Sequence, residues 1–351
     1  MSVKKEVTIY DIARALDISA STVSRGLREH PSVRKDTRKK ILKVAREMGY
    51  QHNTFASSLR KKRTNTIGVV LPRLDSYFMS TVIAGMEKVA KQTGYNLIIS
   101  QSEETFKKEV SCVATMFNSR VDGLLVSLAS DTENLNHLNI LFNKGIPVVF
   151  FDRVMDHPGC ISIVIDNFKA GYDITSHLIR QDCKRIVHIG GCLKRNVYKE
   201  RFNGYKKALE KNKISCNENL VFIGEMDERA GTEVVNRIIS GDIKADGIFA
   251  SNDTTAVACI CRLKQSGIRV PEDISVAGFN NDPISRVIDP NLTTINYPGQ
   301  EMGEVAASTL INKLNDISST HLNSIVLKHE LIQRSSSKKM ESIPKAVRIG
   351  S

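Results

Sequence analysis

Residues 8–27 read TIYDIARALDISASTVSRGL, and this stretch decides how the N-terminal part of the chain folds. Thr8 is followed three residues later by Asp11, a spacing typical of a helix start at which the two side chains bond each other's backbone amides. Ile12 and Leu16 recur at helical spacing on one face. The pattern therefore predicts a short helix that begins after Thr8 and ends at Leu16.

A turn and a second helix follow directly. Asp17 occupies a position that often needs a left-handed backbone, which aspartate tolerates better than most residues. Ser19 is placed as the N-cap of the second helix, in which Val23 and Leu27 face inward with Ile18. Small, hydroxyl-bearing or cationic residues remain to face outward: Ala20, Ser21, Thr22, Ser24, Arg25 and Arg28. In a helix-turn-helix, the first residues of this second helix reach the edges of DNA bases.

A third helix is predicted over residues 35–48. Gly49 ends it, because glycine is the usual residue just past a helix C-terminus. Its expected buried residues are Ile41, Leu42, Ala45 and Met48.

Charge sets this module apart from the rest of the chain. Residues 1–64 hold 16 Lys and Arg against 6 Asp and Glu, so they carry +10 of the chain's formal charge of +12. The other 287 residues carry only +2. A basic module in front of a near-neutral body indicates a nucleic-acid reader. The alternative is a three-helix bundle whose charges form only a solvated face.

Three segments carry a resemblance to a known family. VTIYDIA at 7–13, ISASTVSR at 18–25 and TRKKILKVAREMGY at 37–50 resemble the headpiece of the lactose/galactose repressor family of bacterial transcription regulators. The match continues to about Arg334. It implies base reading through Ala20, Ser21 and Arg25, within a larger set of expected DNA contacts: Thr8, Ser19, Ala20, Ser21, Thr22, Ser24 and Arg25.

Residues 53–63, NTFASSLRKKR, form a second expected contact with DNA. As plain sequence the segment is a polar linker, and such linkers are usually disordered. The resemblance implies instead a hinge helix that enters the minor groove, with Leu59 as an apolar wedge between base pairs. Many relatives have proline where this chain has Thr54. The expected DNA contacts here are Asn53, Ala56, Leu59 and Arg60.

From Thr66 onward, short β-branched apolar runs alternate with helical patterns of 12–16 residues. Such alternation predicts parallel sheets covered by helices on both faces, and two rounds of it predict two lobes. The expected fold is α/β: an all-α helix-turn-helix headpiece plus a two-lobed core, which the family resemblance implies is similar to a periplasmic binding protein. We predict a headpiece at 1–52, a hinge at 53–64 and a core at 65–335. The N-lobe is expected at about 65–164 and 293–322, the C-lobe at 165–292 and 323–335, and a disordered tail at 336–351.

Ligands of such sheets bind beyond the carboxyl ends of the strands. Polar and aromatic residues follow these strands, which suits a small polar ligand in a cleft between the lobes. Asn252 could instead simply cap a helix. The resemblance implies effector contacts from Arg201 and Asn252, and it places Asp152 and Arg153 on the cleft. With the aromatic and purine-branch positions added, the expected effector-binding residues are Phe78, Asp152, Arg153, Arg195, Arg201, Asn252 and Asn280.

Two departures bear on the effector's identity. Asn280 stands where the best-known relatives have aspartate, and an amide cannot serve as a pure acceptor. Val197 replaces a hydroxyl found in the purine-binding branch. A sugar or sugar derivative is still expected rather than a purine.

The absence of several sequence motifs argues against the classes of enzyme that carry them. The chain contains no GxSxG elbow, no phosphate-binding GxxxxGK[ST] loop, no HExxH and no Rossmann glycine triplet. No signal peptide or membrane span is expected, and the seven cysteines show no metal-ligand spacing, so we expect free thiols, no metal and no cofactor. A plain sugar-binding protein and a sugar-acting enzyme with an accessory DNA domain are the alternatives. The preferred interpretation is a cytoplasmic, homodimeric regulator that binds a near-palindromic double-stranded operator under the control of an effector.

Overall fold

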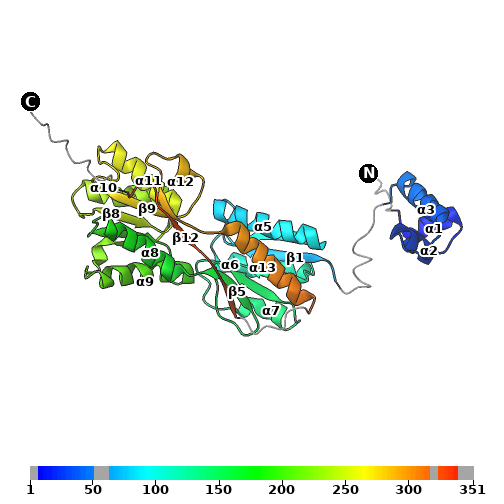
Figure 1. Cartoon of the computed structure of the whole chain (residues 1–351). Coiled ribbons are helices and arrows are strands. Elements are labelled where there is room, and N and C mark those ends of the chain that lie inside the picture. Colours follow the sequence, from blue (N-terminus) through cyan, green and yellow to red (C-terminus); the bar gives the residue numbers. More distant parts are fainter. Residues whose placement is uncertain (1–6, 51–62, 317–322, 339–351) are drawn as a thin grey trace, which may run out of the picture. The chain divides into compact units, whose positions relative to one another are not determined.

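The computed structural model describes residues 7–50, 63–316 and 323–338. The chain divides into two compact units, one within residues 1–64 and one within residues 65–351. Figure 1 labels the elements of both units, which are taken separately below.

The first unit is a three-helix headpiece made of α1 (Ile9–Leu16), α2 (Ala20–Leu27) and α3 (Lys35–Glu47). The predicted start of α1 is confirmed, because the Asp11 carboxylate accepts hydrogen bonds from the Thr8 backbone amide at 2.9 Å and from its hydroxyl at 2.7 Å. Asp17 takes the predicted left-handed backbone, with φ of 53° and ψ of 46°. Local sequence thus sets both the helix start and the turn.

The headpiece core contains Ile12, Ala13, Val23, Ile41 and Ala45. One inward-facing and one outward-facing assignment were wrong in detail. Val44, rather than Leu42, packs beside the core from α3. The methyl group of Ala20 also packs against this core, so it does not face fully outward. Both differences arise because the angle at which the helices cross decides which residues beside the apolar face of each helix are buried.

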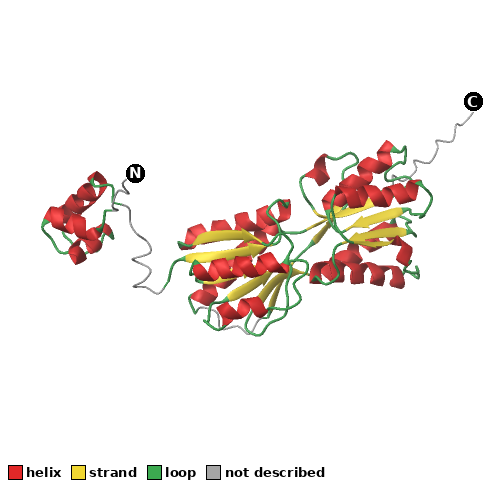
Figure 2. Cartoon of the chain, turned by 180° about the vertical axis from the view of Figure 1, so that it is seen from behind, coloured by secondary structure: helices red, strands yellow, loops and turns green. Residues whose placement is uncertain are grey.

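The second unit contains two sheets with helices on both faces of each, as Figure 2 shows. The first sheet has the strand order β11-β5-β4-β3-β1-β2 and is parallel throughout its described pairings. Its strands are β1 (Thr66–Leu71), β2 (Asn96–Gln101), β3 (Gly123–Val126), β4 (Val148–Phe151), β5 (Ile161–Ile165) and β11 (Ser324–Leu327).

The second sheet has the order β12-β10-β9-β8-β6-β7. Only β12 runs antiparallel to its neighbour among the described pairings. Its strands are β6 (Ile186–Gly190), β7 (Val221–Ile223), β8 (Gly247–Ala250), β9 (Ser275–Asn280), β10 (Thr293–Asn296) and β12 (Glu330–Ile332).

Helices cover the sheets in pairs. Helices α5 and α13 pack together on the first sheet, α8 and α9 pack together on the second, and α10 packs against α11. The bounds are α5 (Tyr77–Thr93), α6 (Phe106–Asn118), α7 (Asn139–Phe142), α8 (Asn167–Arg180), α9 (Asn196–Lys211), α10 (Glu228–Ile239), α11 (Asp253–Gln265), α12 (Ile284–Val287) and α13 (Gly299–Leu314), with short 3₁₀ turns at Asn136–Leu138 and Glu218–Leu220.

Strand residues alternate between the two faces, as the pleat requires. In β1, Ile67 and Val69 join the apolar cluster that includes α5 and α13, whereas Val70 joins a separate cluster with α6. The first of these clusters runs on into the second lobe through Phe279 and Tyr297. Apolar packing therefore continues from one lobe to the other beneath the strand ends.

The predicted lobe boundaries near the C-terminus were wrong. Residues 293–322 were predicted in the N-lobe; α13 does pack on the first sheet, but β10 pairs with β9 of the second sheet, with Thr294 opposite Gly278. Residues 323–335 were predicted in the C-lobe; β12 does pair in the second sheet, but β11 pairs with β5 of the first sheet. Each strand is short, and β11 buries only Leu327, so neither carried a core pattern that showed its partner.

The expected disordered tail was also wrong at its start. Ser336 and Ser337 are fully buried. The Ser336 hydroxyl accepts from the Thr293 amide at 2.8 Å and donates to the Val276 carbonyl at 2.6 Å. The Ser336 hydroxyl thus satisfies buried backbone groups inside the C-lobe. The sequence predicted a disordered tail because this run of residues is polar. Residues 339–351, with the absence of a coiled coil predicted there, lie outside the described residues.

No helix in the described part of the chain is both long enough and apolar enough to cross a membrane. All seven cysteines are free thiols, and four of them are buried.

Candidate functional site

The N-terminus of α2 presents the expected DNA-reading surface. Ser19 caps the helix as predicted, since its hydroxyl accepts from the Thr22 amide at 3.2 Å. The same oxygen lies 2.8 Å from the hydroxyls of Ser21 and Thr22. Ser21 and Arg25 are exposed, and the Arg25 guanidinium donates to the Ser21 carbonyl at 3.4 Å. The hydroxyl donors and the guanidinium therefore lie on the free side of α2, one turn apart.

Gly26 holds α2 close to α3. A Cβ at this position would lie 2.4 Å from Cδ1 of Ile41, so a larger residue would require the Ile41 side chain to move. Sequence periodicity did not single out this residue. The predicted hinge contacts Asn53, Ala56, Leu59 and Arg60 lie outside the described residues and remain predictions.

The second candidate site is a cavity of about 850 Å³ between the two lobes of the core. Its walls come from segments that follow the strands of both sheets, including those after β1, β4, β6, β8, β9 and β10. This is the edge at which α/β sheets bind ligands. Six of the seven predicted effector residues line it: Phe78, Asp152, Arg153, Arg201, Asn252 and Asn280.

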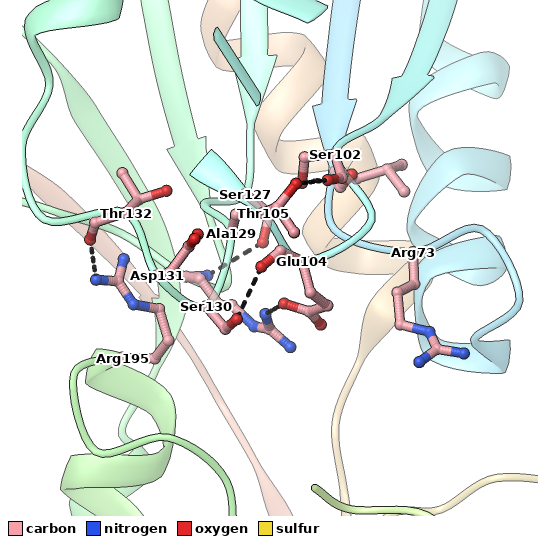
Figure 3. Close-up of polar contacts among 12 residues, drawn as sticks. Arg73, Ser102, Glu104, Thr105, Ser127, Ala129, Ser130, Asp131, Thr132 and Arg195 are labelled. Atoms are coloured by element: carbon pink, nitrogen blue, oxygen red, sulfur yellow. Dashed lines mark hydrogen bonds and ion pairs between the residues drawn. The ribbon is translucent and has the colours of Figure 1, made fainter. Parts of the chain in front are cut away.

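Arg195 is the exception and does not line this cavity. It precedes α9 and is 2% exposed, and its guanidinium donates to the Thr132 carbonyl of the other lobe. Figure 3 shows the side chain reaching this carbonyl. The expected effector contact from Arg195 is therefore replaced by a contact between lobes, because a protein acceptor lies within its reach.

Arg201 lies deep in the cavity on α9, only 3% exposed. Its Nε donates to the Asn167 side chain at 2.9 Å and its Nη1 to the Ser251 carbonyl at 3.0 Å. The guanidinium carbon lies 3.5 Å from the centroid of the Phe279 ring, which favours a cation–π contact. Burial lowers the pKa of Arg201, although the tyrosines and Asp152 around it act in the other direction. Two hydrogen bonds and the Phe279 ring thus hold the guanidinium in place, and Nη2 makes no hydrogen bond within the part of the chain that the structure describes.

Asp152 follows β4 and has a left-handed backbone, with φ of 58°. Its carboxylate accepts from the Tyr297 hydroxyl at 2.7 Å and from the Ser127 hydroxyl at 3.3 Å. Burial raises the pKa of Asp152 above its usual range. Tyr297 in turn stacks on Phe78, with ring centroids 4.2 Å apart. An aromatic wall and a buried acid therefore meet at the floor of the cavity.

The neighbouring Arg153 is paired within the protein. Its Nη1 forms an ion pair with Glu104, and its Nη2 donates to the Tyr198 hydroxyl at 3.1 Å. Glu104 itself lies in the loop after β2, beside Ser130, as Figure 3 shows. Because Tyr198 belongs to α9, this arginine also joins the two lobes.

Asn252 performs the capping role that was the alternative to ligand binding. Its Oδ1 accepts from the Thr255 amide at 2.8 Å at the start of α11. Its amide nitrogen donates to the Met226 carbonyl at 2.7 Å. The side chain also lines the cavity, so capping fixes its position at the wall.

Among the cavity residues that were absent from the predicted set, three are polar side chains near Arg201 and Asn280: Tyr198, Asp282 and Tyr297. Asp282 lies among polar residues that follow β9, and its position after a strand was the available signal. Tyr297 follows β10, a strand that sequence assigned to the wrong lobe. Tyr198 lies inside a helix, and nothing local distinguishes it from a surface tyrosine.

The first residue of α9 and the loop before it also bind the opposite lobe through their side chains. Lys194 forms an ion pair with Glu133, and Arg195 binds the Thr132 carbonyl. Asn196 accepts from the Val154 amide and donates to the Asp152 carbonyl, both at 3.0 Å. Three consecutive residues of one lobe thus contact the other.

Comparison with known families agrees with this architecture. Residues 8–53 match the family described as bacterial regulatory proteins, lacI family, and residues 175–337 match the periplasmic binding protein-like domain. The described residues therefore comprise a helix-turn-helix headpiece and a periplasmic-binding-protein-like core.

Full-length relatives cover nearly the whole chain. Catabolite control protein A of Priestia megaterium is 31% identical over 310 residues, which cover 88% of this chain and 93% of the relative. The transcriptional regulator RegA of Clostridium saccharobutylicum is 33% identical over 332 residues, covering 94% and 98%. The transcriptional repressor PurR of Vibrio atlanticus is 31% identical over 332 residues, with the same coverage.

Solved structures show the same fold. The lac repressor dimer bound to operator and an anti-inducer has a TM-score of 0.84 at 24% identity, covering 95% of this chain and 99% of that one. The regulator CcpA of Lactococcus lactis has a TM-score of 0.71 at 30% identity, covering 78% and 99%.

Proposed function

Because this chain belongs to the lacI family of bacterial regulatory proteins and is a DNA-binding transcriptional regulator rather than an enzyme, we propose that a small effector in the cavity between its lobes controls its affinity for an operator. We propose that the effector is a sugar or sugar derivative. The observation that carries this proposal is the joint position of six expected effector residues on one interlobe cavity.

The DNA-reading surface we propose is α2. Its support is the exposed Ser21 and Arg25 on a helix whose N-terminus is fixed by Ser19. Arginine pairs bidentately with guanine, and small hydroxyls bond either to bases or to phosphates. The +10 balance of residues 1–64 adds a phosphate attraction that depends steeply on salt.

We further propose that the protein acts as a homodimer in the cytoplasm on a near-palindromic operator. Paired reading helices require a two-fold protein and two half-sites. The related lac repressor structure is described as a dimer bound to operator, which supports the proposal by analogy.

The effector class follows from the chemistry of the walls. Stacked rings of Phe78 and Tyr297 offer an apolar face, while Arg201, Asn252 and Asn280 offer hydrogen bonds. A sugar ring presents hydroxyls at its edge and C–H groups on its face, so it uses both kinds of wall. A purine could also stack here, and it stays the second candidate.

Coupling to DNA would operate through the lobes. An effector that binds one lobe arrangement more tightly shifts the equilibrium toward it. We propose that this changes how the two hinge segments meet in a dimer, and so controls insertion of Leu59 at the operator centre.

Three measurements test the proposal. Operator selection from a random duplex library should yield a near-palindrome, and fluorescence anisotropy should then show a 5–150-fold change in affinity, roughly the range of allosteric coupling, with one compound of a sugar and nucleobase panel. A thermal-shift screen finds that compound, since a ligand at 100 times its Kd stabilises by about 2.7 kcal/mol. Specific operator binding that no stabilising compound alters would overturn effector control.

A further inference from the structure

Tyr198 lines the interlobe cavity, and several contacts fix its ring in place. It lies in the first turn of α9 and is half-buried, so part of its side chain remains accessible. Its hydroxyl accepts from Nη2 of Arg153, a residue of the other lobe, at 3.1 Å. The guanidinium carbons of Arg153 and Arg201 lie 5.5 and 5.7 Å from the ring centroid, within the range of cation–π attraction. The orientation of the ring is thus set before a ligand binds.

Gly191, which follows β6 and also lines the cavity, supports one face of this ring. A Cβ at position 191 would lie 2.6, 2.7 and 2.8 Å from Cε2, Cδ2 and Cζ of Tyr198, three consecutive atoms of the ring. A point at nearly equal distance from three consecutive ring atoms lies over the face of the ring, not beyond its edge. The backbone therefore covers one face of Tyr198, and the accessible part of the ring belongs to the other face and the edge.

A reachable hydrogen-bond donor lies beside this ring. Arg201 uses Nε and Nη1 for hydrogen bonds to Asn167 and Ser251. Its Nη2 makes no hydrogen bond in the described part of the chain, yet it is not one of the fully buried polar atoms without a partner, so it retains accessible surface. Since Arg201 lines the cavity, a ligand that accepts from Nη2 is brought next to Tyr198.

A second aromatic surface also borders Arg201. The centroid of the Tyr297 ring lies 5.5 Å from the guanidinium carbon, and this ring stacks on Phe78. Among the ring contacts of the described residues, none joins Tyr198 to Tyr297. Both tyrosines therefore approach the same guanidinium without packing on each other. Arg201 thus has Tyr198 on one side and the Phe78–Tyr297 pair on another.

The charges of the lining disfavour an anionic ligand. Three arginines line the cavity, and two of them form ion pairs, Arg73 with Asp75 and Arg153 with Glu104. Six acids line it: Asp75, Glu104, Asp152, Glu225, Asp227 and Asp282. An anion would be attracted by Arg201 but repelled by this excess of acids. An uncharged ligand with hydroxyl groups can accept from Arg201 without that repulsion.

A cyclic sugar fits both the donor and the ring. Its hydroxyls lie around the edge of the sugar ring and can accept from Nη2 of Arg201, while the C–H groups on its face can pack on an aromatic ring. An open-chain polyol carries the same kind of hydroxyl but has no rigid apolar face. Because the Tyr198 ring is already fixed, little ordering of the protein opposes stacking on it.

We propose that Tyr198 is a specificity-determining residue of the effector site: the accessible face of its ring stacks on the C–H face of an uncharged cyclic sugar and selects it over open-chain polyols. This proposal rests on the proposed function, since it requires an effector in the interlobe cavity. The hydroxyl bond to Arg153 orients the ring, and the selection belongs to the ring itself.

Two variants separate the ring from the hydroxyl. Tyr198→Phe and Tyr198→Leu both lose the bond to Arg153, which keeps its ion pair with Glu104, and they differ in the aromatic face. Tyr172→Leu is the matched control. It makes the same substitution at a half-buried tyrosine of α8 that lies 5.6 Å from Lys211 and does not line this cavity. Circular dichroism confirms that each variant is folded.

The full chain is tested with glucose, galactose, maltose, cellobiose, the open-chain polyols glucitol and galactitol, and the bases hypoxanthine and guanine. Thermal shift ranks binding, and titration calorimetry gives Kd for the compounds that stabilise. We expect a cyclic sugar to bind more tightly than either polyol. Tyr198→Phe should keep its Kd within about twofold, whereas Tyr198→Leu should bind it about three- to tenfold more weakly than Tyr198→Phe, roughly the contribution of one aromatic contact. Tyr172→Leu should leave Kd unchanged.

Equal losses in Tyr198→Phe and Tyr198→Leu would overturn the proposal, because the hydroxyl would then be the group that matters. Unchanged affinity in folded Tyr198→Leu would overturn it too, as would a polyol or a base that binds more tightly than every sugar, or no binding by any sugar. Effector control of the operator fails separately. A sugar that shows the expected losses but leaves operator affinity unchanged would overturn effector control and leave the role of Tyr198 intact.

Discussion

Asn196→Ala removes a pair of hydrogen bonds between the lobes and little else. Asn196 is the first residue of α9, and its side chain spans two backbone groups that follow β4, the Val154 amide and the Asp152 carbonyl, each at 3.0 Å. A hydrogen bond contributes about 0.5–1.5 kcal/mol net, so the two contribute about 1–3 kcal/mol to this lobe arrangement. Alanine retains helix propensity at the start of α9.

The expected result is a shift of the lobe equilibrium rather than unfolding. If the effector binds the arrangement seen here, losing about 1–3 kcal/mol of its stability weakens binding by up to about 5–150-fold, the limit being reached when the other arrangement becomes dominant. Calorimetry with the effector found in the thermal-shift screen measures that change, and small-angle scattering of the free protein reports whether the lobes separate. Operator affinity should change in the same titrations.

Asn212→Ala provides the matched control, because it makes the same substitution at the other end of α9. The Asn212 side chain donates to the Ala208 carbonyl at 2.8 Å inside one lobe. This variant should lower the unfolding free energy slightly without altering effector affinity. The reasoning is refuted if the two variants have equal effects on effector affinity, or if Asn196→Ala leaves scattering and affinity unchanged.

Four further outcomes are expected. Arg25→Ala should cost about 1–3 kcal/mol on the operator and relax preference at one base position, and an equal loss on random DNA in anisotropy would make Arg25 a phosphate contact. Arg201→Ala should remove about 1.5–3 kcal/mol of effector binding while operator affinity stays intact; a normal effector response would contradict its role. Gly303→Ala should destabilise the core by about 1–3 kcal/mol in urea unfolding, since the new Cβ would lie 1.9 Å from the Val82 carbonyl oxygen, and a neutral result would show that α5 and α13 separate freely. Burial raises the pKa of Asp253 to about 8, above its value of 3.8 in the unfolded chain, so stability should fall by up to about 1.4 kcal/mol per pH unit as pH rises from 6 to 8, and urea unfolding of Asp253→Asn should show a shallower slope.

The sequence alone determined the elements whose cause is local. Three features depend only on residues close in sequence: the start of α1, the left-handed backbone of Asp17 and the Ser19 cap. They can therefore be predicted without knowing which distant residues lie nearby. The alternation of apolar runs and helices likewise predicted two parallel sheets, because strands buried on both faces read as continuous apolar runs. Since the carboxyl ends of parallel strands share an edge, even the cavity lining was largely predictable.

Only the tertiary structure decided which distant segments meet. β10 and β11 are each four residues long, and their lobes were assigned wrongly because pairing with β9 and β5 depends on backbone hydrogen bonds that leave little trace in side-chain pattern. Ser336 was wrongly placed in a disordered tail for the same reason, because it is held by hydrogen bonds to the backbone of distant strands.

The partners of polar side chains were decided in the same way. Arg195 and Arg201 are six positions apart with the same donor chemistry, yet one reaches the Thr132 carbonyl across the lobes and the other lines the cavity. Asp253 and Asp282 both follow strands, but the Asp253 carboxylate accepts from the Asp282 amide and the Thr294 hydroxyl, whereas Oδ1 of Asp282 is buried without a hydrogen-bond partner among the described residues. A polar residue's type specifies what it can bond, and the packing of remote elements specifies which groups come within about 3 Å of it.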